Sequence, residues 1–284
     1  MKTYKKYWGK ADKDGQYHLL INHCLDVAAV ADCWWQQDLA LQQTFQRAIK
    51  IEPDQLRAWL LFFIALHDLG KFDVRFQLKS RKIALELQPS FAKANQSSSC
   101  KFHHGVWGYS WFEIECRKYG FDNYSHEHEL EWMLPVASHH GIWVNAERWL
   151  GKFADPIVIQ YDSQARQQWV IALRELLLAP VGIQTGDEPP KLSESAQHLV
   201  AGFCSISDWI GSNQDFFPYD SDDKELDDYL KSRHRNAKKA LQDFGLFYKP
   251  LLHGGMHIFP KINMPHGIQT LNVFLWIICV GQIM

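Results

Sequence analysis

The sequence lacks several features that would assign it at once to a common class of protein. It has no CxxC pair, and its six cysteines are widely scattered, which is typical of reduced thiols in a cytoplasmic protein. The formal net charge is −2, so the overall basic signature of a nucleic-acid binder is absent. There is no GxxxxGK[ST] phosphate loop, and we therefore expect no ATP site in this chain.

No apolar run has the length or the setting of a membrane helix or a signal peptide. Residues 1–15 are basic and then polar, without a hydrophobic segment ahead of a small-residue cleavage site. The strongly apolar run at 271–281 is shorter than the roughly 20 residues that span a bilayer. We therefore expect no interaction with a membrane.

The residues that are present predict an all-α protein. The chain has 284 residues, of which 46% are hydrophobic, enough for a large core. Apolar residues recur at helical spacing, and no segment alternates as a strand does. We predict one domain over 1–245, followed by a less regular tail at 246–284. The expected helices lie at 18–35, 56–69, 104–119, 127–140, 165–178, 195–211 and 226–244.

Local signals add detail to this pattern. The helix at 18–35 should turn His23 toward the core. The helix at 56–69 is apolar almost all round, which indicates a central buried position, and Gly70 is placed to cap its C-terminus. Gly105 and Gly108 would permit close backbone packing, and Pro135 either kinks its helix or marks its first turn. Residues 79–101 and 141–163 are expected to be irregular connections.

The doublet His67-Asp68 ends the apolar run LLFFIALHDLGK and needs a polar partner, because an unpaired buried polar group costs several kcal/mol. A metal ion is one such partner, and further histidines and one aspartate on other helices offer the remaining ligands. Taken singly, each of these is a weak signal, since a histidine often caps or fills a helical core. Together they form a mixed nitrogen and oxygen donor set that suits Mn, Fe, Co, Ni or Zn. The candidates are His23, His67, Asp68, His104, His139, His140 and Asp208.

The order of these residues resembles the HD phosphohydrolase superfamily. Within it, the chain is similar to the nuclease domain of the type I CRISPR-associated helicase-nuclease, in particular the subtype I-E branch. The resemblance covers about residues 5–250. It is carried by HLLINHCLDVAAVADCWW, RAWLLFFIALHDLGKFDVRFQ, KFHHGVWGYSWF, ASHHG, LLAPVGI and LVAGFCSISDWIGS.

The resemblance implies an all-α HD-domain bundle around a two-metal site. Two neighbours on one helix diverge by about 100°, so His67 and Asp68 can serve two neighbouring ions if Asp68 bridges them. Lys71 would contact the scissile phosphate, whereas His18 and His103 would be bystanders. One ion would be held by His23, His67, Asp68 and Asp208, and the other by Asp68, His104, His139 and His140.

The implied function is metal-dependent cleavage of single-stranded DNA in type I CRISPR interference. The implied partners are a crRNA-guided surveillance complex and a helicase, which a separate chain could supply. In the family, the chain continues into a helicase near residue 250, whereas here the tail 246–284 reads as truncated or divergent. Two alternatives remain open. The HD site could hydrolyse nucleotides or cyclic dinucleotides, or a helicase-less copy could bind the surveillance complex as a decoy or regulator.

Basic and aromatic residues near the candidate site could form a groove for a single strand. The alternative is that the tryptophans fill the core and the basic residues form a solvated face. The residues concerned are Trp107, Trp111, Trp143, Trp149, Lys71, Arg75, Lys79, Arg81 and Lys82.

Overall fold

A bundle of helices forms the part of the chain that the computed structural model describes, which is residues 2–94, 102–121, 125–145 and 156–246. The all-α prediction is confirmed. The helices are α1 (Leu20–Gln37), α2 (Leu39–Ala48), α3 (Pro53–Ile64), α4 (Val74–Gln77), α5 (Arg81–Leu87), α6 (His104–Glu115), α7 (Glu127–Ala137), α8 (Pro156–Leu173), α9 (Glu194–Gly211) and α10 (Leu226–Asp243). Trp149 and nearly all of the predicted tail lie outside the described residues.

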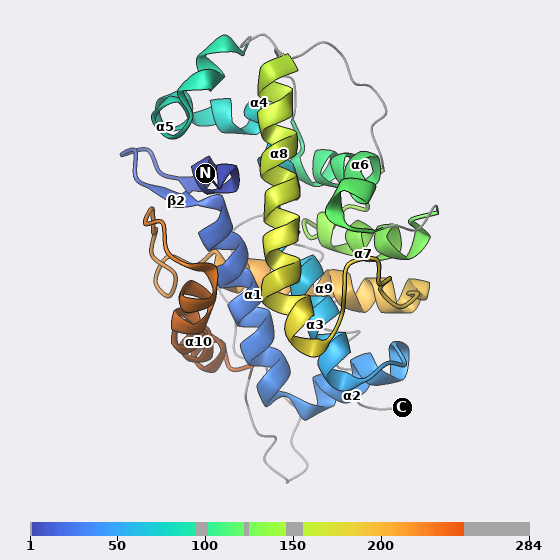
Figure 1. Cartoon of the computed structure of the whole chain (residues 1–284). Helices are drawn as coiled ribbons and strands as arrows, with labels where there is room; N and C mark the ends of the chain where they lie inside the picture. Colours follow the sequence, from blue (N-terminus) through green and yellow to red (C-terminus); the bar gives the residue numbers. More distant parts are fainter. Residues whose placement is uncertain (1, 95–101, 122–124, 146–155, 247–284) are drawn as a thin grey trace.

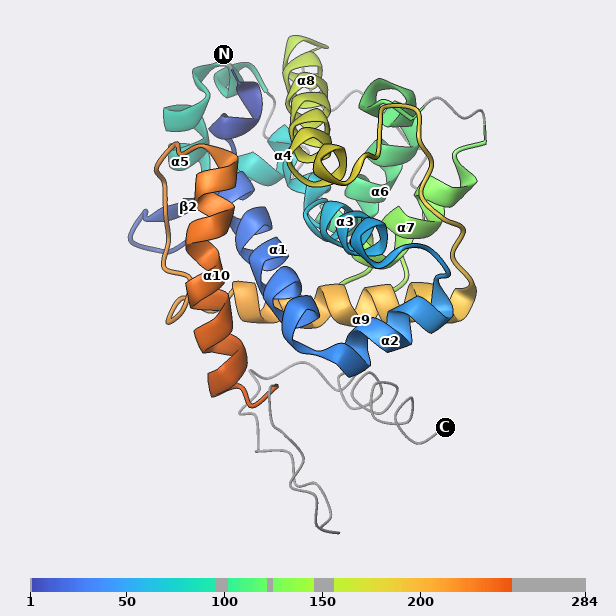
Figure 2. The ribbon, with the colours of Figure 1, turned by 60° about the horizontal axis from the view of Figure 1, so that its bottom comes forward.

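Helix α1 runs through the molecule, and its partners surround it (Figures 1 and 2). It packs against α3, α9 and α10, and all of its residues from Leu20 to Trp35 are buried. Elsewhere in the bundle, α6 packs against α7, and α7 packs against α9. His23 is 1% exposed, which confirms its predicted inward position.

Local sequence explains where several helices begin. The Asp38 carboxylate accepts a hydrogen bond from the Leu41 backbone amide and caps α2, and the Ser193 hydroxyl does the same for Ala196 in α9. Pro53 occupies the first turn of α3, where its missing amide donor costs nothing. Among the described cysteines, Cys24, Cys33, Cys116 and Cys204 are buried free thiols.

The predicted helix at 56–69 is wrong at its end, because α3 stops at Ile64 and His67-Asp68 lie in the turns that follow it. The chain there makes tight i to i+3 bonds: Leu66 N–H donates to Phe63 O over 2.9 Å, and His67 N–H to Ile64 O over 3.1 Å. A short 3₁₀ turn at Leu69–Lys71 follows. The apolar period does not separate such turns from a continuing α-helix, because both bury the same side chains.

Gly70 is not a left-handed helix cap, as the sequence had suggested. Its φ is not among the positive values, and it instead meets the start of α6. A Cβ on Gly70 would collide with the His104 carbonyl and come within 2.6 Å of the Gly108 backbone nitrogen. The predicted close packing of Gly105 and Gly108 is confirmed, since a Cβ on Gly105 would collide with Ala137 O and one on Gly108 would lie 2.9 Å from Gly70 N.

Other boundaries also differ from the predictions. The helix expected at 127–140 ends at Ala137, and Pro135 lies inside its last turn rather than its first. Helix α8 begins at Pro156, within the segment expected to be irregular, and a π-helical turn at Arg174–Leu178 continues it. The expected connection at 79–101 contains α5 and the short 3₁₀ turn Pro89–Lys93.

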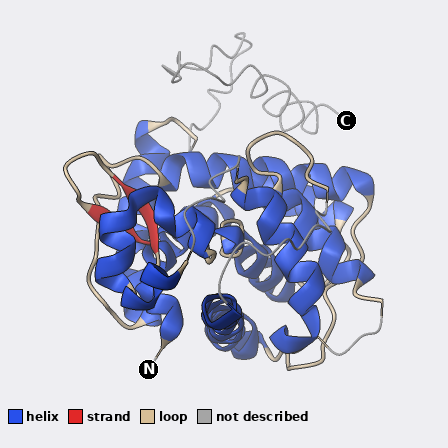
Figure 3. Ribbon diagram, turned by 90° about the horizontal axis from the view of Figure 1, so that it is seen from above, coloured by secondary structure: helices blue, strands red, loops and turns tan. Residues whose placement is uncertain are grey.

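A small antiparallel hairpin was not predicted at all. It pairs β1 (Trp8–Ala11) with β2 (Tyr17–Leu19), and Figure 3 shows it as the sole sheet among the described residues. Strands of three and four residues are too short for alternation to show in the sequence. Among the same residues, no helix combines the length and apolar character needed to cross a bilayer.

Helix α8 carries a buried carboxyl group whose titration should make stability depend on pH. Asp162 accepts hydrogen bonds from Tyr7 Oη and Val74 N, each over 2.8 Å. Burial and then the nearby Asp73 carboxylate raise the pKa of Asp162 to about 8. Because this is above the unfolded value of about 3.9, the unfolded state binds fewer protons between these values, and stability falls as the pH rises through that window.

The side chain of the Asp162→Asn variant is neutral at every pH, so its folding stability should not fall as the pH rises through this window. The stability of Asp162→Asn relative to the wild type should therefore improve between pH 5 and pH 8. Thermal or urea unfolding at several pH values measures this difference. A constant difference between the two proteins across the window would contradict the assignment.

Candidate metal centre

Seven side chains that the sequence singled out meet at one place, although they come from distant elements. His23 comes from α1, His67 and Asp68 from the turns after α3, and His104 from the first residue of α6. His139 and His140 follow α7, and Asp208 lies in α9. The close packing of α6 against the turn at Gly70 and of α9 against α1 brings these segments together.

One group of ligand atoms forms around the Asp68 Oδ2 and Asp208 Oδ1 atoms. His23 Nε2 lies 3.2 Å from the first and 3.3 Å from the second. His67 Nε2 lies 3.4 Å and 3.6 Å from the same two atoms, and 3.3 Å from His23 Nε2. Two imidazole nitrogens and two carboxylate oxygens therefore face a common point.

A second group lies on the other side of Asp68. His104 Nε2 is 3.3 Å from Asp68 Oδ1 and 2.9 Å from His140 Nε2. His139 belongs to this group together with His104 and His140. It is also close to His67 and Asp208, and its Nε2 lies 4.0 Å from Asp208 Oδ2. The two oxygens of Asp68 thus face different histidine groups, which is the arrangement that a bridging carboxylate requires.

Backbone carbonyls fix the orientation of two of the imidazoles. His67 Nδ1 donates to Ile64 O over 2.8 Å, and His139 Nδ1 donates to Val136 O over 2.7 Å. In each case the acceptor is three residues earlier, where the preceding helix ends or turns. These bonds occupy Nδ1 and leave Nε2 directed into the site, where it can bind a metal ion in place of a proton.

The electrostatics of the site favour a cation between the carboxylates. Burial acts to raise the pKa of Asp68, but Lys71 and His67 outweigh it and hold the pKa well below its usual range. Burial likewise opposes ionisation of Asp208, and hydrogen bonds from His23 and His67 keep its pKa low. Although burial alone would lower the pKa of His67, the two carboxylates raise it to about 9. A positive charge is therefore stabilised where both carboxylates converge.

The other imidazoles are held neutral. Burial, with the neighbouring His67 charge, lowers the pKa of His139 to about 3. Burial lowers the pKa of His104 to about 2, and it also lowers the pKa values of His23 and His140. Neutral imidazole is the form that coordinates a metal.

The donors present fit a pair of divalent transition-metal ions. Both Asp68 carboxylate oxygens and His23 Nδ1 are buried without a hydrogen-bond partner among the described residues, although the Lys71 ammonium forms an ion pair with Asp68. Buried polar atoms without partners are rare in folded proteins. Imidazole nitrogens mixed with carboxylate oxygens are ligands typical of Mn, Fe, Co, Ni and Zn.

Comparison with known proteins agrees with this geometry. A family model described as "Cas3, HD domain" matches residues 8–217. The chain belongs to the Cas3 HD-domain family. It is 40% identical over 294 residues to the CRISPR-associated endonuclease/helicase Cas3 of Escherichia coli (strain K12). That alignment covers 93% of this chain and 33% of the relative, so the chain spans about a third of the relative's length.

Solved structures of Cas3 proteins show the same fold. The Thermus thermophilus cas3 HD domain, crystallised in the presence of Ni²⁺, matches with a TM-score of 0.60 and 23% identity, covering 86% of this chain and 91% of that one. A CRISPR RNA-guided surveillance complex in a pre-nicking state contains a chain that matches with a TM-score of 0.64 and 20% identity, covering 84% of this chain and 29% of that one. The predicted HD bundle is therefore confirmed.

Within this HD domain, Lys71 lies deeper than the sequence had suggested. Its Nζ is 2.6 Å from Asp68 Oδ2 and donates to Gly9 O over 3.2 Å, and the residue is only 8% exposed. The ammonium thus compensates the charge of the proposed bridging carboxylate. Its predicted contact with a scissile phosphate stays a prediction.

Arg166, which was not predicted as a functional residue, supports the loop that carries His67 and Asp68. This fully buried arginine in α8 makes a two-pronged ion pair with Glu115, with Nε 2.8 Å and Nη2 3.0 Å from the carboxylate oxygens. Its Nη1 also donates to Phe72 O over 2.6 Å, next to Lys71. An arginine within a mixed helical segment gives no sequence signal of such a role, because its partners lie far away along the chain.

The predicted groove residues divide between core and surface. Trp107 and Trp111 are 7% and 6% exposed and pack in a second apolar cluster with Phe76 and Phe102, which favours the structural interpretation for them. Arg75 is paired with Asp73 over 2.6 Å and stacks on Trp107. Further members of the predicted groove remain accessible: Trp143, Lys79, Arg81 and Lys82 are exposed or partly exposed.

Proposed function

We propose that this chain is a metal-dependent nuclease that hydrolyses phosphodiester bonds of single-stranded DNA in type I CRISPR interference. The single observation that carries the proposal is the Asp68 carboxylate shared between two histidine groups in a chain of the Cas3 HD-domain family. One ion would be held by His23, His67, Asp68 and Asp208, and the other by Asp68, His104, His139 and His140.

Two bound ions would supply Lewis acidity at a phosphoryl oxygen and a lowered pKa for a water molecule. The chain's own residues position that chemistry. Ile64 O and Val136 O hold His67 and His139 with Nε2 inward. Lys71 balances part of the carboxylate charge, so that the ligand cluster is stable within an apolar core.

A protein nucleophile is disfavoured by the surroundings of the nearest thiols. Cys24 and Cys204 are fully buried, and burial together with nearby carboxylates raises their pKa values well above the usual range. Because the thiolate is the reactive form of cysteine, neither residue is suited to attack a phosphate. We therefore propose direct hydrolysis by water as the route of cleavage.

The proposed substrate and partners rest on the relatives. The Escherichia coli relative is named as both endonuclease and helicase, and another related chain belongs to a CRISPR RNA-guided surveillance complex. We propose that such a complex exposes the single strand. The family match ends at residue 217, so a helicase that feeds the strand would lie outside this domain.

Cleavage of a circular single-stranded DNA tests this function. With Mn²⁺, Co²⁺, Ni²⁺ or Zn²⁺ we expect the circle to become linear and then fragment, and excess chelator should prevent both steps. Circles report endonucleolytic cutting alone, because they have no ends for an exonuclease. Hydrolysis of nucleotides or cyclic dinucleotides without any cutting of the circle would instead support the phosphohydrolase alternative.

The second proposed ion gives a further prediction with a matched control. His104→Ala should lower metal affinity by at least about tenfold and reduce the bound metal from two ions toward one, because a ligand is lost. His103 is the exposed neighbour, and His103→Ala should leave both quantities unchanged. Titration calorimetry and elemental analysis measure them. Equal metal content in the two variants would contradict the second ion's ligand set.

A further inference from the structure

The hairpin β1–β2 forms part of the wall of the candidate metal centre. The Gly9 carbonyl in β1 accepts the hydrogen bond from Lys71 Nζ over 3.2 Å. A Cβ on Gly9 would lie 2.9 Å from Leu20 Cα and 3.5 Å from His23 Cβ, so the strand touches the start of α1 beside a proposed metal ligand. Only a glycine allows the strand to approach this closely.

The register of the hairpin is irregular at this same glycine. Trp8 pairs with Leu19 and Lys10 pairs with His18, so two steps along β1 match one step along β2. Gly9 is therefore the extra residue of a β-bulge. Bulges redirect the following side chain and occur frequently next to active sites. The side chain redirected here is that of Lys10.

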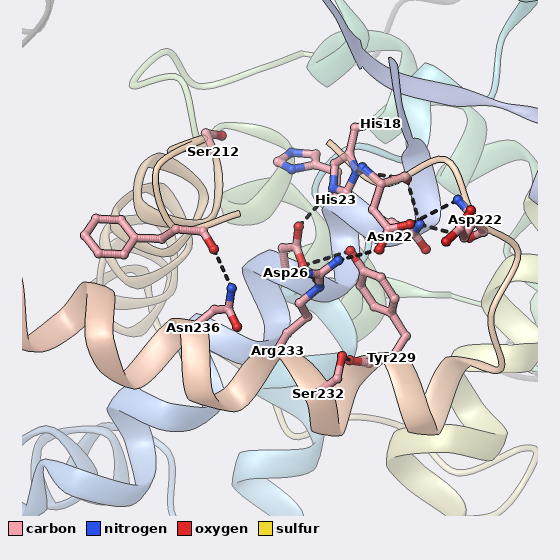
Figure 4. A network of polar contacts seen from close by, with 12 residues as sticks. His18, Asn22, His23, Asp26, Ser212, Asp222, Tyr229, Ser232, Arg233 and Asn236 are labelled. Carbon is pink, nitrogen blue, oxygen red and sulfur yellow. Dashed lines mark hydrogen bonds and ion pairs between the residues drawn. The ribbon is translucent and has the colours of Figure 1, made fainter. Parts of the chain in front are cut away.

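Both ends of the bulge are firmly anchored. On one side, Trp8 N donates to Gln77 Oε1 and its Nε1 donates to Gln77 O, each over 3.1 Å. On the other side, His18 Nε2 donates to the buried Asp26 carboxylate over 2.9 Å. Figure 4 shows that Asp26 is in turn held by residues of α10, among them Tyr229, whose hydroxyl donates to Asp26 over 3.1 Å. The hairpin is thus a rigid support for Lys10.

Lys10 differs from Lys71 in that its ammonium group is not paired with a carboxylate of the described residues. Lys71 pairs with Asp68, whereas the Lys10 side chain has no hydrogen bond or ion pair with any described residue. Its cross-strand partner His18 projects from the same face of the hairpin, and the His18 ring lies 6.4 Å from the ring of His23, so Lys10 stands beside the metal centre. Burial lowers the pKa of Lys10 itself, and Asp208 is the carboxylate that opposes this most. Lys10 is partly exposed, in contrast to the buried Lys71.

We propose that Lys10 is a phosphate-binding residue of this site, which holds the backbone of the DNA strand beside the bond that is cut. A free ammonium on a rigid, bulged strand at the rim of the metal centre supports this role, whereas Lys71 stabilises Asp68. The inference rests on the proposed function, since it takes a phosphodiester strand as the ligand.

Binding and cleavage of a fluorescein-labelled oligodeoxythymidine by the whole chain test the inference. We expect Lys10→Gln to weaken binding roughly tenfold, the loss of one charge-assisted hydrogen bond. The slope of log affinity against log salt should become shallower by about 0.7, the value for one phosphate contact on a single strand. In cleavage, KM should rise more than kcat falls. Lys10→Arg should restore binding because it keeps the charge.

Lys13 supplies the matched control, because it lies in the exposed turn of the same hairpin. Lys13→Gln should leave affinity, salt slope and metal content unchanged. An unchanged affinity and slope in Lys10→Gln would overturn the inference, as would a loss of bound metal or of thermal stability in that variant, which indicates a structural role. If the wild type bound the strand but cut nothing, the proposed function would fail, while the salt slope would still decide the role of Lys10.

Discussion

Replacing Asp68 by asparagine is expected to remove metal-dependent cleavage, with a loss of at least about 10³-fold, comparable to the largest effects of removing one preorganised electrostatic group. The carboxylate is 1% exposed, and its two oxygens lie 3.2 Å from His23 Nε2 and 3.3 Å from His104 Nε2. An asparagine has nearly the same shape but offers only one neutral oxygen, so it cannot bridge two cations. Initial rates on circular single-stranded DNA and elemental analysis measure the two losses.

Asp215→Asn is the appropriate control for this variant. Asp215 lies just beyond α9, is exposed, and belongs to neither histidine group, so its replacement should leave rate and metal content unchanged. Circular dichroism should show that both variants fold. Full activity of Asp68→Asn with its normal metal content would rule out the proposed site.

Replacing Arg166 by alanine is expected to lower the free energy of unfolding by about 3–5 kcal/mol, the range for breaking a buried ion pair. The change leaves the Glu115 carboxylate, which is 3% exposed, with only the more distant Lys118 ammonium at 3.9 Å, and it removes the donor to Phe72 O. For a domain of this size we expect a Tm decrease of roughly 6–20 °C. Since Phe72 follows Lys71 directly, metal affinity should fall together with Tm.

The double replacement Arg166→Met with Glu115→Leu separates the buried charge from the packing. It removes both charges, so it should be more stable than Arg166→Ala, although Tyr119 Oη loses the acceptor that it meets at 2.6 Å in the wild type. Urea unfolding of the three proteins gives the comparison. If the double variant were the less stable, lost packing and hydrogen bonds would explain the effect of Arg166→Ala better than an unpaired buried charge.

Much of the candidate site could be predicted because its residues carry local signals. His67-Asp68 ends an apolar run, and His104 and His140 each precede a glycine. The reason for placing His67 and Asp68 on one helix was nevertheless wrong, since α3 ends at Ile64. The tight turns after it change the directions of both side chains, and they are stabilised by packing against α6 at Gly70, a contact that no local pattern reports.

The residues that were missed depend on distant partners. Arg166 acts through Glu115, which is 51 positions away, and Lys10 acquires its role from a bulge that only the pairing of β1 with β2 reveals. Likewise, the inward position of Lys71 follows from the Gly9 carbonyl, which is 62 positions away. Such contacts form when helices and strands pack, and they leave no periodic trace in the chain.

By itself, the sequence determined the helical class, the family resemblance and the choice of the seven candidate ligands, because amphipathic spacing and donor chemistry are properties of short segments. The tertiary structure alone decided how the two Asp68 oxygens are divided between two histidine groups. It also decided that Lys71 pairs with Asp68, whereas Lys10 pairs with no described carboxylate. The physical reason is that distances between side chains on different elements are set by the close packing of backbones, here at Gly70 and Gly9.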